Sequence, residues 1–295
     1  MDKVFITGTS GYIGGSILAQ LVKRGNYQIT AVVRSLDAVP KDVAEKINLV
    51  QGDIYDFDFV REVAKGHNIV IHNVKAGGFE KDLKLINILG EEARYATRDR
   101  PGVFLYTSGV YTCGSGIACE KEEINEDMPA PSISSWGRKQ LEDAVLTFST
   151  INLSAAAVRP GWVFGGALKH RSLFQNYISY SKKHSVIPYI GDLQTLIPTI
   201  HVDDLVNLHL TVLDHRYNGV YTGTDKSQTL EHLLQTLSAH TKLPVKESND
   251  DEFKKLDFAY AMDRSLSINA GNLYARKTGW TVQRPLSQSL NELFD

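Results

Sequence analysis

The chain has 295 residues, of which 42% are hydrophobic and 22% are charged, and its formal net charge is −2. This composition is typical of a globular protein. The near-neutral charge predicts no nucleic-acid or membrane partner, and no apolar run approaches the ~20 residues that span a bilayer. Two cysteines are too few for a disulfide framework or a zinc site, so we expect no metal and a reducing, cytoplasmic location.

The first predicted element is an apolar strand at residues 4–6, which a glycine-rich turn and an amphipathic helix follow. The turn reads Thr7-Gly8-Thr9-Ser10-Gly11-Tyr12-Ile13-Gly14, and apolar residues then recur at helical spacing up to Val22. Glycines allow a sharp turn and a close approach of the backbone to a pyrophosphate, whose charge the helix N-terminus stabilises. A strand, this motif and a helix in that order predict a dinucleotide-binding turn.

A second predicted strand at residues 28–33 ends at Arg34-Ser35, which bears on the choice of dinucleotide. A site for NAD usually carries an acidic residue about 20 residues after the glycines, where it accepts from the ribose 2′-hydroxyl. Here a cation and a hydroxyl stand at that place and suit a 2′-phosphate, so we predict NADP(H) in preference to NAD(H). The alternative is that Arg34 is an ordinary solvated side chain and that Asp37 reaches the ribose.

Strands and helices continue to alternate up to residue 160. We predict strands at residues 47–53, 68–73, 103–107 and 153–159, and helices at about 59–64, 81–97 and 135–148. Strands separated by helices imply right-handed crossovers and a parallel sheet. The prediction is therefore an α/β fold with a Rossmann-type, doubly wound parallel sheet, in which residues 1–160 form the dinucleotide-binding core.

The pattern loosens after Pro160, where glycines and prolines interrupt residues 161–200. Further on we predict a helix that starts near Asp203, a strand at 219–222, and helices at about 227–240, 251–258 and 285–293. We assign residues 161–295 to a smaller, mixed substrate-binding cap, interleaved with the core in a single compact unit. His201 stands near Asp203 and Asp204, and a helix entry rich in acceptors explains this group better than a metal does.

Six short motifs together carry a family resemblance. They are Thr7-Gly8-x-x-Gly11-x-x-Gly14, Gly52-Asp53-Ile54, Val70-Ile71-His72, Tyr106-Thr107-Ser108-Gly109-Val110, Val158-Arg159-Pro160 and Ile200-His201-Val202-Asp203-Asp204. In this order and spacing the chain resembles the extended short-chain dehydrogenase/reductases, the NAD-dependent epimerase/dehydratase group, over nearly its whole length. The resemblance implies that Asp53 contacts the adenine and that residues 73–75 lie along the nicotinamide half. It also implies that Arg159-Pro160 and the loop to Gly165 border the nicotinamide and the substrate.

The glycine motif and the resemblance together predict one set of cofactor-binding residues. They are Gly8, Ser10, Gly11, Tyr12, Ile13, Gly14, Arg34, Ser35, Asp53, Ile54, Asn73, Val74, Lys75, Thr107, Pro160 and Val163. Relatives often pair through a four-helix bundle built from the helices after the fourth and fifth strands. The resemblance therefore also implies a homodimer, through residues 81–97 and 135–148.

The catalytic positions depart from the family pattern. The family uses a Ser or Thr and a Tyr-x-x-x-Lys pair, in which the Lys charge lowers the pKa of the phenol so that it can exchange a proton. The pattern aligns Trp136 with the Tyr and Gln140 with the Lys, whereas a shift of one residue keeps Lys139 but places Ser135 at the Tyr position. An indole is no general acid, and Gln140 carries no charge. The Ser/Thr position falls on Ser108 or Gly109.

Two functions are compatible with this sequence. The first is an NADPH-dependent reductase of a small carbonyl or activated alkene, in which a non-standard group supplies the proton. Candidates by chain position are Tyr106, Tyr111, Lys75 and Lys139. The second is a non-catalytic NADP-binding redox sensor that acts on a protein partner, because fold alone does not decide function. A sugar-nucleotide epimerase ranks lower, since it needs the Tyr.

Overall fold

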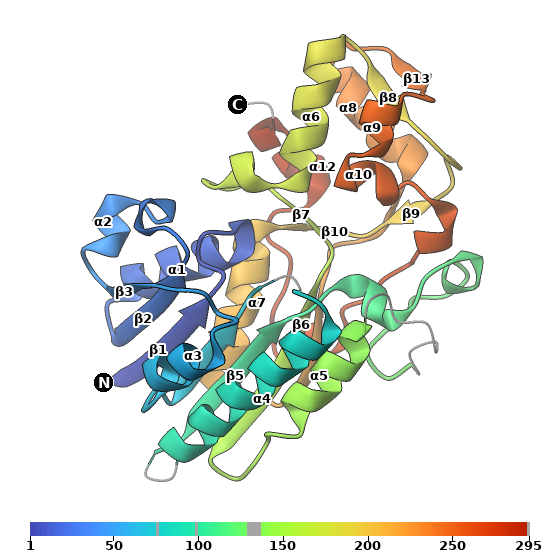
Figure 1. The fold of residues 1–295 in the computed structure, drawn as a ribbon. Helices are drawn as coiled ribbons and strands as arrows, with labels where there is room; N and C mark the ends of the chain where they lie inside the picture. The colour runs from blue at the N-terminus through green and yellow to red at the C-terminus, as the bar shows by residue number, and fades with distance from the viewer. Residues whose placement is uncertain (75–76, 98–99, 129–136, 294–295) are drawn as a thin grey trace. The chain divides into compact units, whose positions relative to one another are not determined.

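The computed structural model describes residues 1–74, 77–97, 100–128 and 137–293. Its main feature is a seven-stranded sheet with the order β3-β2-β1-β4-β5-β6-β11 (Figure 1). The strands are β1 (Asp2–Thr7), β2 (Tyr27–Val33), β3 (Asn48–Gln51), β4 (Ile69–His72), β5 (Gly102–Thr107), β6 (Leu153–Pro160) and β11 (Gly219–Gly223). The pairings from β3 through β6 are all parallel. This order confirms the predicted doubly wound, Rossmann-type sheet.

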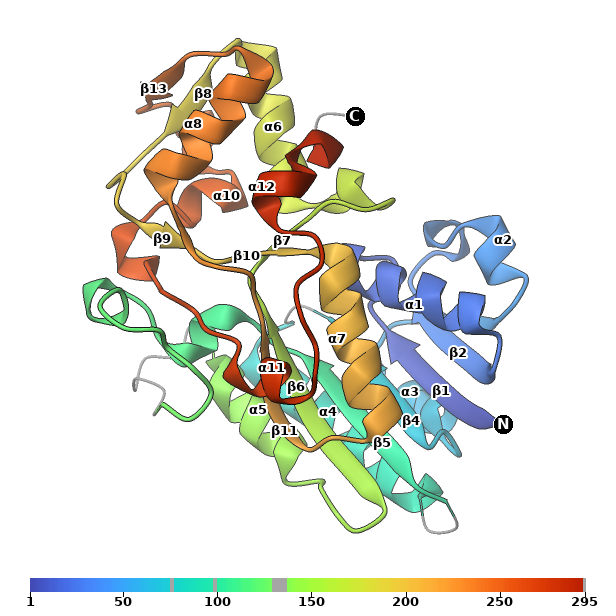
Figure 2. The same cartoon turned by 180° about the vertical axis from the view of Figure 1, so that it is seen from behind.

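Helices cover both faces of this sheet. One face carries α3 (Phe57–Ala64), α4 (Phe79–Ala96) and α5 (Arg138–Leu146), which lie in front in Figure 1. The other face carries α1 (Tyr12–Arg24) and α7 (Val202–His215), which Figure 2 shows from behind. Arg24 and Asp214 join these last two helices by an ion pair of 2.7 Å. The short η1 (Leu36–Ala38) and α2 (Lys41–Ala44) follow β2.

The central strands β4 and β5 are buried along their whole length because helices cover both of their faces. Val4, Phe5 and Ile6 of β1 are fully buried, and so is Phe104 of β5. In α1, an apolar stripe that includes Leu18 faces the sheet. Burial of this kind supplies most of the free energy that holds the helices on the sheet.

The remaining elements form several small sheets and helices. The two-stranded pairs are β7 (Trp162–Phe164) with β10 (Thr199–His201), β9 (Leu196–Ile197) with β12 (Gln228–Thr229), and β8 (Ile187–Tyr189) with β13 (Val245–Glu247). The helices are α6 (Leu173–His184), α8 (Leu230–Thr241), α9 (Asp251–Lys254), α10 (Asp257–Tyr260), α11 (Leu273–Lys277) and α12 (Leu286–Ser289). Single 3-10 turns are η2 (Val110–Cys113), η3 (Ile117–Cys119), η5 (Lys169–Arg171), η6 (Arg264–Leu266) and η7 (Leu290–Leu293). An aromatic core of Phe164, Phe174, Tyr177, Phe253 and Phe258 holds part of this region together.

Three predicted elements in the later part of the chain were wrong in detail. The segment 161–200, which we predicted to be irregular, contains the 12-residue helix α6, whose Ser172 side chain accepts from the Gln175 N–H at its start. The helix predicted at 251–258 is split into α9 and α10. The helix predicted at 285–293 consists of the single turns α12 and η7. The glycines and prolines of residues 161–200 obscured the helical signal of α6.

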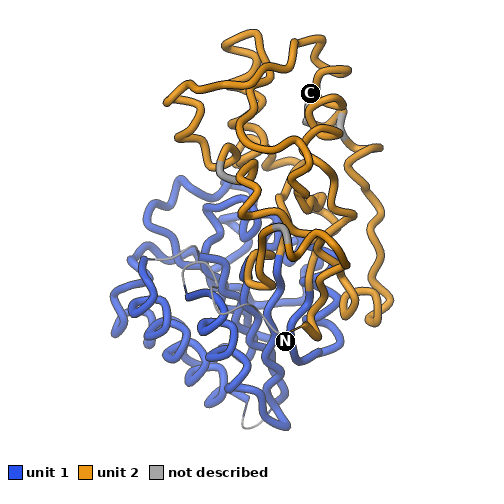
Figure 3. Tube along the Cα trace, turned by 90° about the vertical axis from the view of Figure 1, so that its right-hand side faces the viewer, with its two compact units in different colours: residues 1–109, 135–159, 206–221 blue, residues 110–134, 160–205, 222–295 orange. Residues whose placement is uncertain are grey.

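The chain divides into two compact units (Figure 3). Unit 1 comprises residues 1–109, 135–159 and 206–221, and unit 2 comprises residues 110–134, 160–205 and 222–295. The predicted division at residue 160 stays a prediction. Within the described part of the chain, no helix has the length and apolar character that a membrane crossing requires.

Candidate functional site

The glycine turn after β1 is closely packed against the end of β4. Gly8 has φ +76°, and a Cβ added there would lie 2.7 Å from the Asn73 carbonyl oxygen. A Cβ at Gly14 would lie 2.3 Å from the Gly8 carbonyl oxygen, and the Gly11 N–H donates to that same oxygen at 3.0 Å. Only glycine fits at Gly8 and Gly14 without a shift of the backbone. The turn thus has the tight geometry that the motif predicts.

The N-terminus of α1 has the properties of an anion site. Gly11 is the N-cap, no side chain caps the helix, and its first turn contains no acidic residue. The neighbouring Thr9 is 1% exposed, and its hydroxyl has no hydrogen-bond partner among the described residues. Ser10 is exposed, whereas Tyr12 and Ile13 are half-buried. Backbone N–H groups, the helix dipole and an unsatisfied hydroxyl all fit a bound pyrophosphate.

The end of β2 presents Arg34 and Ser35 to solvent, as the prediction requires. Gln51 of β3 donates to the backbone oxygen of Arg34 at 3.1 Å, which fixes the main chain at this point. Among the described residues, no ion pair is recorded for the Arg34 guanidinium. Asp37, the alternative ribose ligand, lies in the first turn of η1 and is also exposed.

The turn after β3 is connected to the loop after β4 through Tyr55. The exposed Asp53 carboxylate accepts from the Tyr55 N–H at 3.0 Å, with Ile54 half-buried between them. The Tyr55 hydroxyl donates to the buried Asp82 carboxylate at 2.8 Å and accepts from the Gly77 N–H at 2.6 Å. Burial, followed by the hydrogen bond to Asp82, raises the pKa of Tyr55 to about 12. Sequence reasoning missed Tyr55, because 27 residues separate it from Asp82.

A partly buried chain of hydrogen bonds joins the carboxyl ends of β1, β4 and β5. The Asn73 side chain donates to the Thr7 carbonyl at 3.2 Å and accepts from the Thr107 hydroxyl at 2.6 Å. Because that hydroxyl proton goes to Asn73, the His209 Nε2–H donates to Thr107, at 2.9 Å. His209 of α7 is fully buried, and sequence reasoning missed it. Val74 is half-buried, and Lys75 lies outside the described residues.

His72, next to this chain, is neutral in the folded protein because burial lowers its pKa to about 4. Its Nδ1 lies 2.8 Å from the Thr7 hydroxyl, and its ring stacks on Tyr106 at 5.7 Å. Burial also lowers the pKa of His67. The unfolded chain protonates these histidines near pH 6.5 and the folded protein only at lower pH, so acid favours unfolding.

We therefore expect the free energy of unfolding to fall between pH 7 and pH 5, with His72 alone contributing about 2 kcal/mol at pH 5. Urea unfolding at the two pH values measures this. His72→Gln should remove most of the contribution of His72 to this pH dependence. His215→Gln, at an exposed position, should leave the pH dependence unchanged. An unchanged pH dependence in His72→Gln would contradict the assignment.

Of the predicted catalytic positions, Lys139 and Gln140 lie in the first turn of α5, and Ser108 directly follows β5. Ser108 is buried, and its N–H donates to the Val158 carbonyl at 2.8 Å. Lys139 forms an ion pair with Asp143 on its own helix, and Gln140 is exposed. A Cβ added to Gly109 would lie 3.7 Å from the Arg138 guanidinium, so a cation stands beside this part of the β5 loop. Trp136, like Ser135, lies outside the described residues.

A buried ion pair joins α5 to β6. The Arg159 guanidinium donates to both oxygens of the Glu142 carboxylate, from Nε at 2.9 Å and from Nη2 at 2.6 Å. The two side chains are only 6% and 0% exposed. This two-point contact sets the rotation of α5 relative to the end of β6.

Within unit 2, Pro160 ends β6 and Val163 lies in β7, where it pairs with Ile200 of β10. His201 of β10 accepts from the Asp203 N–H at 3.1 Å through Nδ1, and its Nε2 lies 2.9 Å from the Glu292 carboxylate. Both ring nitrogens of His201 thus contact other polar groups of the protein. Among the described residues, no group of three His, Cys, Asp or Glu side chains is arranged to hold a metal ion.

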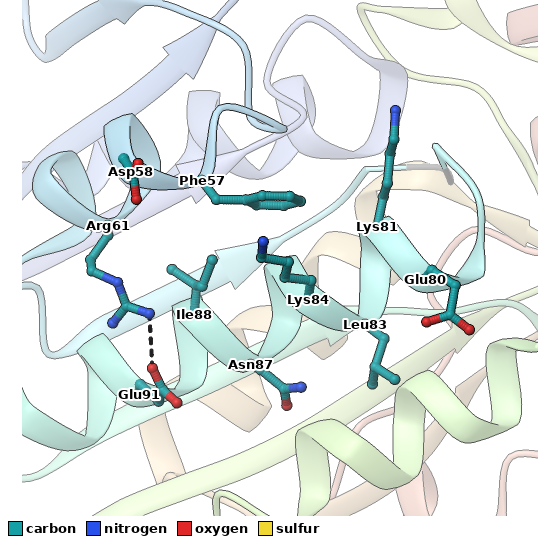
Figure 4. A pocket seen from close by; sticks show the side chains of 10 residues that line it. All are labelled: Phe57, Asp58, Arg61, Glu80, Lys81, Leu83, Lys84, Asn87, Ile88 and Glu91. Atoms are coloured by element: carbon teal, nitrogen blue, oxygen red, sulfur yellow. Dashed lines mark hydrogen bonds and ion pairs between the residues drawn. The ribbon is translucent and has the colours of Figure 1, made fainter.

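A surface pocket of about 580 Å³ lies between α3 and α4 of unit 1 (Figure 4). Arg61 crosses it to Glu91 at 3.1 Å, and the Lys84 ammonium lies 4.4 Å from the centre of the Phe57 ring. Cations and carboxylates along the pocket neutralise one another. The pocket is lined by α3 and α4 alone, whereas ligands of this fold bind outside the carboxyl ends of the strands.

Comparison with known proteins agrees with the fold and the glycine turn. The model of the NAD dependent epimerase/dehydratase family matches residues 4–222. The uncharacterized protein y4nG of Sinorhizobium fredii is 26% identical over 82% of this chain, and the match spans only 61% of that relative. The 2-alkyl-3-oxoalkanoate reductase of Stenotrophomonas maltophilia is 23% identical over 72% of this chain and 65% of its own length.

Among solved structures, MoeE5 in complex with UDP-glucose and NAD superposes with a TM-score of 0.77 at 18% identity. The match covers 99% of this chain and 97% of that one, which shows a shared fold. The family model covers most of the chain, including the glycine turn and the sheet from β1 to β6. The chain therefore belongs to the NAD-dependent epimerase/dehydratase family.

Proposed function

We propose that this protein is an NADPH-dependent reductase of a small carbonyl or activated alkene, with a non-standard proton donor. The observation that carries the cofactor choice is Arg34, which is exposed at the end of β2 with no recorded ion pair among the described residues. Its guanidinium suits a 2′-phosphate, and Ser35 adds a hydroxyl. The pyrophosphate would bind at Gly8, Gly11 and the N-terminus of α1. When bound, the nicotinamide supplies the hydride.

The proton donor must differ from that of the family, because the sequence lacks the usual pair. None of the 13 tyrosines is followed by a lysine four residues later. At the aligned positions stand Trp136, which can only donate a hydrogen bond, and the uncharged Gln140. Reduction remains chemically accessible, since the cofactor carries the hydride and the protein must supply only position and one proton.

The reductase named among the relatives supports this class of reaction more than epimerisation. An epimerase must first oxidise a hydroxyl of its substrate, which needs a strong general base at the Tyr position. The described part of α5 has Lys139 paired with Asp143 and offers no such base. A reductase needs only a weak acid near the developing alkoxide.

A second candidate function is a non-catalytic NADP-binding regulator that acts on a protein partner. The substitution at Gln140 favours it, because the change removes a charge that catalysis uses and leaves the glycine turn intact. Purified protein mixed with NADPH and a panel of aldehydes, ketones and enones separates the two functions. Loss of absorbance of the reduced cofactor supports the reductase, whereas tight binding without turnover across the panel supports the regulator.

Replacing Arg34 by alanine tests the cofactor choice. We expect NADPH binding to weaken by about 1.5–3 kcal/mol, the contribution of a charged hydrogen bond, and NADH binding to remain nearly unchanged. Lys41→Ala is the control, because Lys41 is a nearby cation whose side chain is 91% exposed. Titration of cofactor fluorescence measures both affinities. Equal losses for NADPH and NADH would show that Arg34 does not contact a 2′-phosphate.

A further inference from the structure

The contact between Tyr55 and the start of α4 is a feature of unit 1 that the proposed reaction does not use. The Tyr55 hydroxyl donates to the Asp82 carboxylate at 2.8 Å. The Gly77 N–H donates to that hydroxyl at 2.6 Å and to the same carboxylate oxygen at 3.2 Å. Tyr55 lies two residues before α3, whereas Gly77 precedes α4 by two residues and Asp82 lies in its first turn. A triangle of hydrogen bonds thus joins the starts of these two helices.

The Tyr55 ring packs tightly against Gly77. A Cβ added to Gly77 would lie 2.5 Å from Cζ of that ring and 2.7 Å from its hydroxyl oxygen. These distances are shorter than a van der Waals contact, so any side chain at position 77 would displace the ring. The Lys81 ammonium of α4 lies 5.9 Å from the centre of the same ring. The phenol is therefore held by packing as well as by hydrogen bonds.

Asp82 is a buried carboxylate to which the proposed reaction assigns no role. The residue is only 4% exposed. A buried carboxylate is costly unless hydrogen bonds and a favourable field compensate for the lost water. Here the Tyr55 hydroxyl and the Gly77 N–H donate to it, and the positive end of the α4 dipole stabilises its charge. Loss of the phenol as a donor would therefore force the start of α4 to rearrange or to admit water.

The start of α4 forms one wall of the crevice in which a doubly wound sheet binds its dinucleotide. The strand order of the sheet reverses between β1 and β4. The helices that follow these two strands, α1 and α4, lie on opposite faces of the sheet (Figure 1 and Figure 2). In this fold the ligand binds between them, outside the carboxyl ends of the strands. The glycine turn builds the α1 wall, and Tyr55 holds the α4 wall.

We propose that Tyr55 and Asp82 form a latch that holds the start of α4 in the position that binds the dinucleotide, so that Tyr55 is a positioning residue for the cofactor. This inference rests on the dinucleotide-binding part of the proposed function and is independent of the proton donor. Only the latched fraction of the protein binds tightly, so the apparent affinity falls in proportion when the latch opens. Because the latch does not involve Arg34 at the end of β2, it serves NADPH and NADH alike.

Tyr55→Phe tests the latch in the full-length protein, because it removes the hydroxyl and keeps the ring. We expect the affinities for NADPH and for NADH to fall by the same factor, on the order of 10–100-fold, since a hydrogen bond to a charged group is lost. Titration of cofactor fluorescence measures both affinities. Tyr27→Phe is the matched control, because Tyr27 begins β2 and so lies at the amino ends of the strands. The control should keep both affinities.

A double-mutant cycle shows whether Tyr55 acts through Asp82. Asp82→Ala should lower the affinity for NADPH about as much as Tyr55→Phe does. The double variant should lose little more affinity than either single variant, because both changes open the same latch, whereas independent effects would add. Asp82→Asn keeps an acceptor oxygen for the phenol and for the Gly77 N–H, so it should retain most of the affinity.

Hydrogen exchange of the cofactor-free protein tests the latch without a ligand. The Gly77 N–H donates to the phenol, so its exchange reports whether the latch is closed. In Tyr55→Phe we expect a peptide that contains Gly77 and Asp82 to exchange faster, on the order of 10-fold or more. A peptide from the middle of β5, which is buried along its whole length, should exchange as in the wild type.

The outcomes separate the latch from the proposed function. Unchanged affinities in Tyr55→Phe, additive losses in the cycle, unchanged exchange at Gly77 or a loss confined to NADPH would each overturn the latch and leave the reductase function standing. A wild type that binds neither dinucleotide would overturn both proposals. Equal losses for the two cofactors, together with a non-additive cycle and faster exchange at Gly77, support the latch.

Discussion

Gly8→Ala is expected to abolish tight cofactor binding. The left-handed backbone at φ +76° costs an L-residue about 1–2 kcal/mol, and the methyl group would lie 2.7 Å from the Asn73 carbonyl oxygen. Relief of such an overlap costs a further ~1–3 kcal/mol. The turn must move away from the end of β4, which displaces the helix N-terminus from the pyrophosphate. We expect the affinity for NADPH to fall on the order of 100-fold in a fluorescence titration, in line with these energies.

Gly25→Ala is the matched control for this prediction. Gly25 ends α1 with a similar φ of +69°, but a Cβ there would meet nothing within 4 Å. This variant should therefore lose about 1–2 kcal/mol of stability from backbone strain and keep its affinity for NADPH. Equal affinities in Gly8→Ala and in the wild type would show that the cofactor does not bind at this turn.

Removing Glu142 is expected to destabilise the protein more than any exposed substitution. Glu142→Ala leaves the Arg159 guanidinium buried without its carboxylate, because the two side chains are 0% and 6% exposed. Breaking a buried ion pair by removing one partner costs about 3–5 kcal/mol. Urea unfolding, monitored by circular dichroism, should show this loss as a lower urea concentration at the midpoint.

Two variants control for this effect. Glu91→Ala breaks an ion pair with Arg61 in which both side chains are more than 40% exposed, so it should cost less than about 1 kcal/mol. The double change Glu142→Met with Arg159→Met removes both buried charges and should recover much of the lost stability. If Glu142→Ala lost no more stability than Glu91→Ala, the buried ion pair would not be a determinant of stability.

The first half of the fold was predictable because its signals are local. Each parallel strand contains a short apolar stretch, and the motif at Gly8 occupies eight consecutive residues. Even α6, which was missed, has a local signal in the cap at Ser172 and in apolar residues at helical spacing from Phe174 to Ile178. The many glycines and prolines nearby obscured it.

The contacts that shape the site were not predictable, since they join distant parts of the chain. His209 meets Thr107 across 102 residues, and Asp82 meets Tyr55 across 27. Such pairs arise only when strands and helices assemble. The one available hint was that His209 lies on the apolar face of α7, three and four residues after Val206 and Leu205, because a buried imidazole needs a partner.

The alternation of the two units along the chain has a consequence for folding during synthesis. Residues 206–221 return to unit 1 only after residues 160–205 of unit 2 have been made, and they include most of β11, which lies at the edge of the sheet beside β6. At a synthesis rate of about 5–20 residues per second, β6 remains an uncovered edge for several seconds. An exposed edge of this kind invites pairing with other chains. We therefore expect ribosome-bound fragments that end before residue 219 to be more prone to aggregation than those that extend beyond β11.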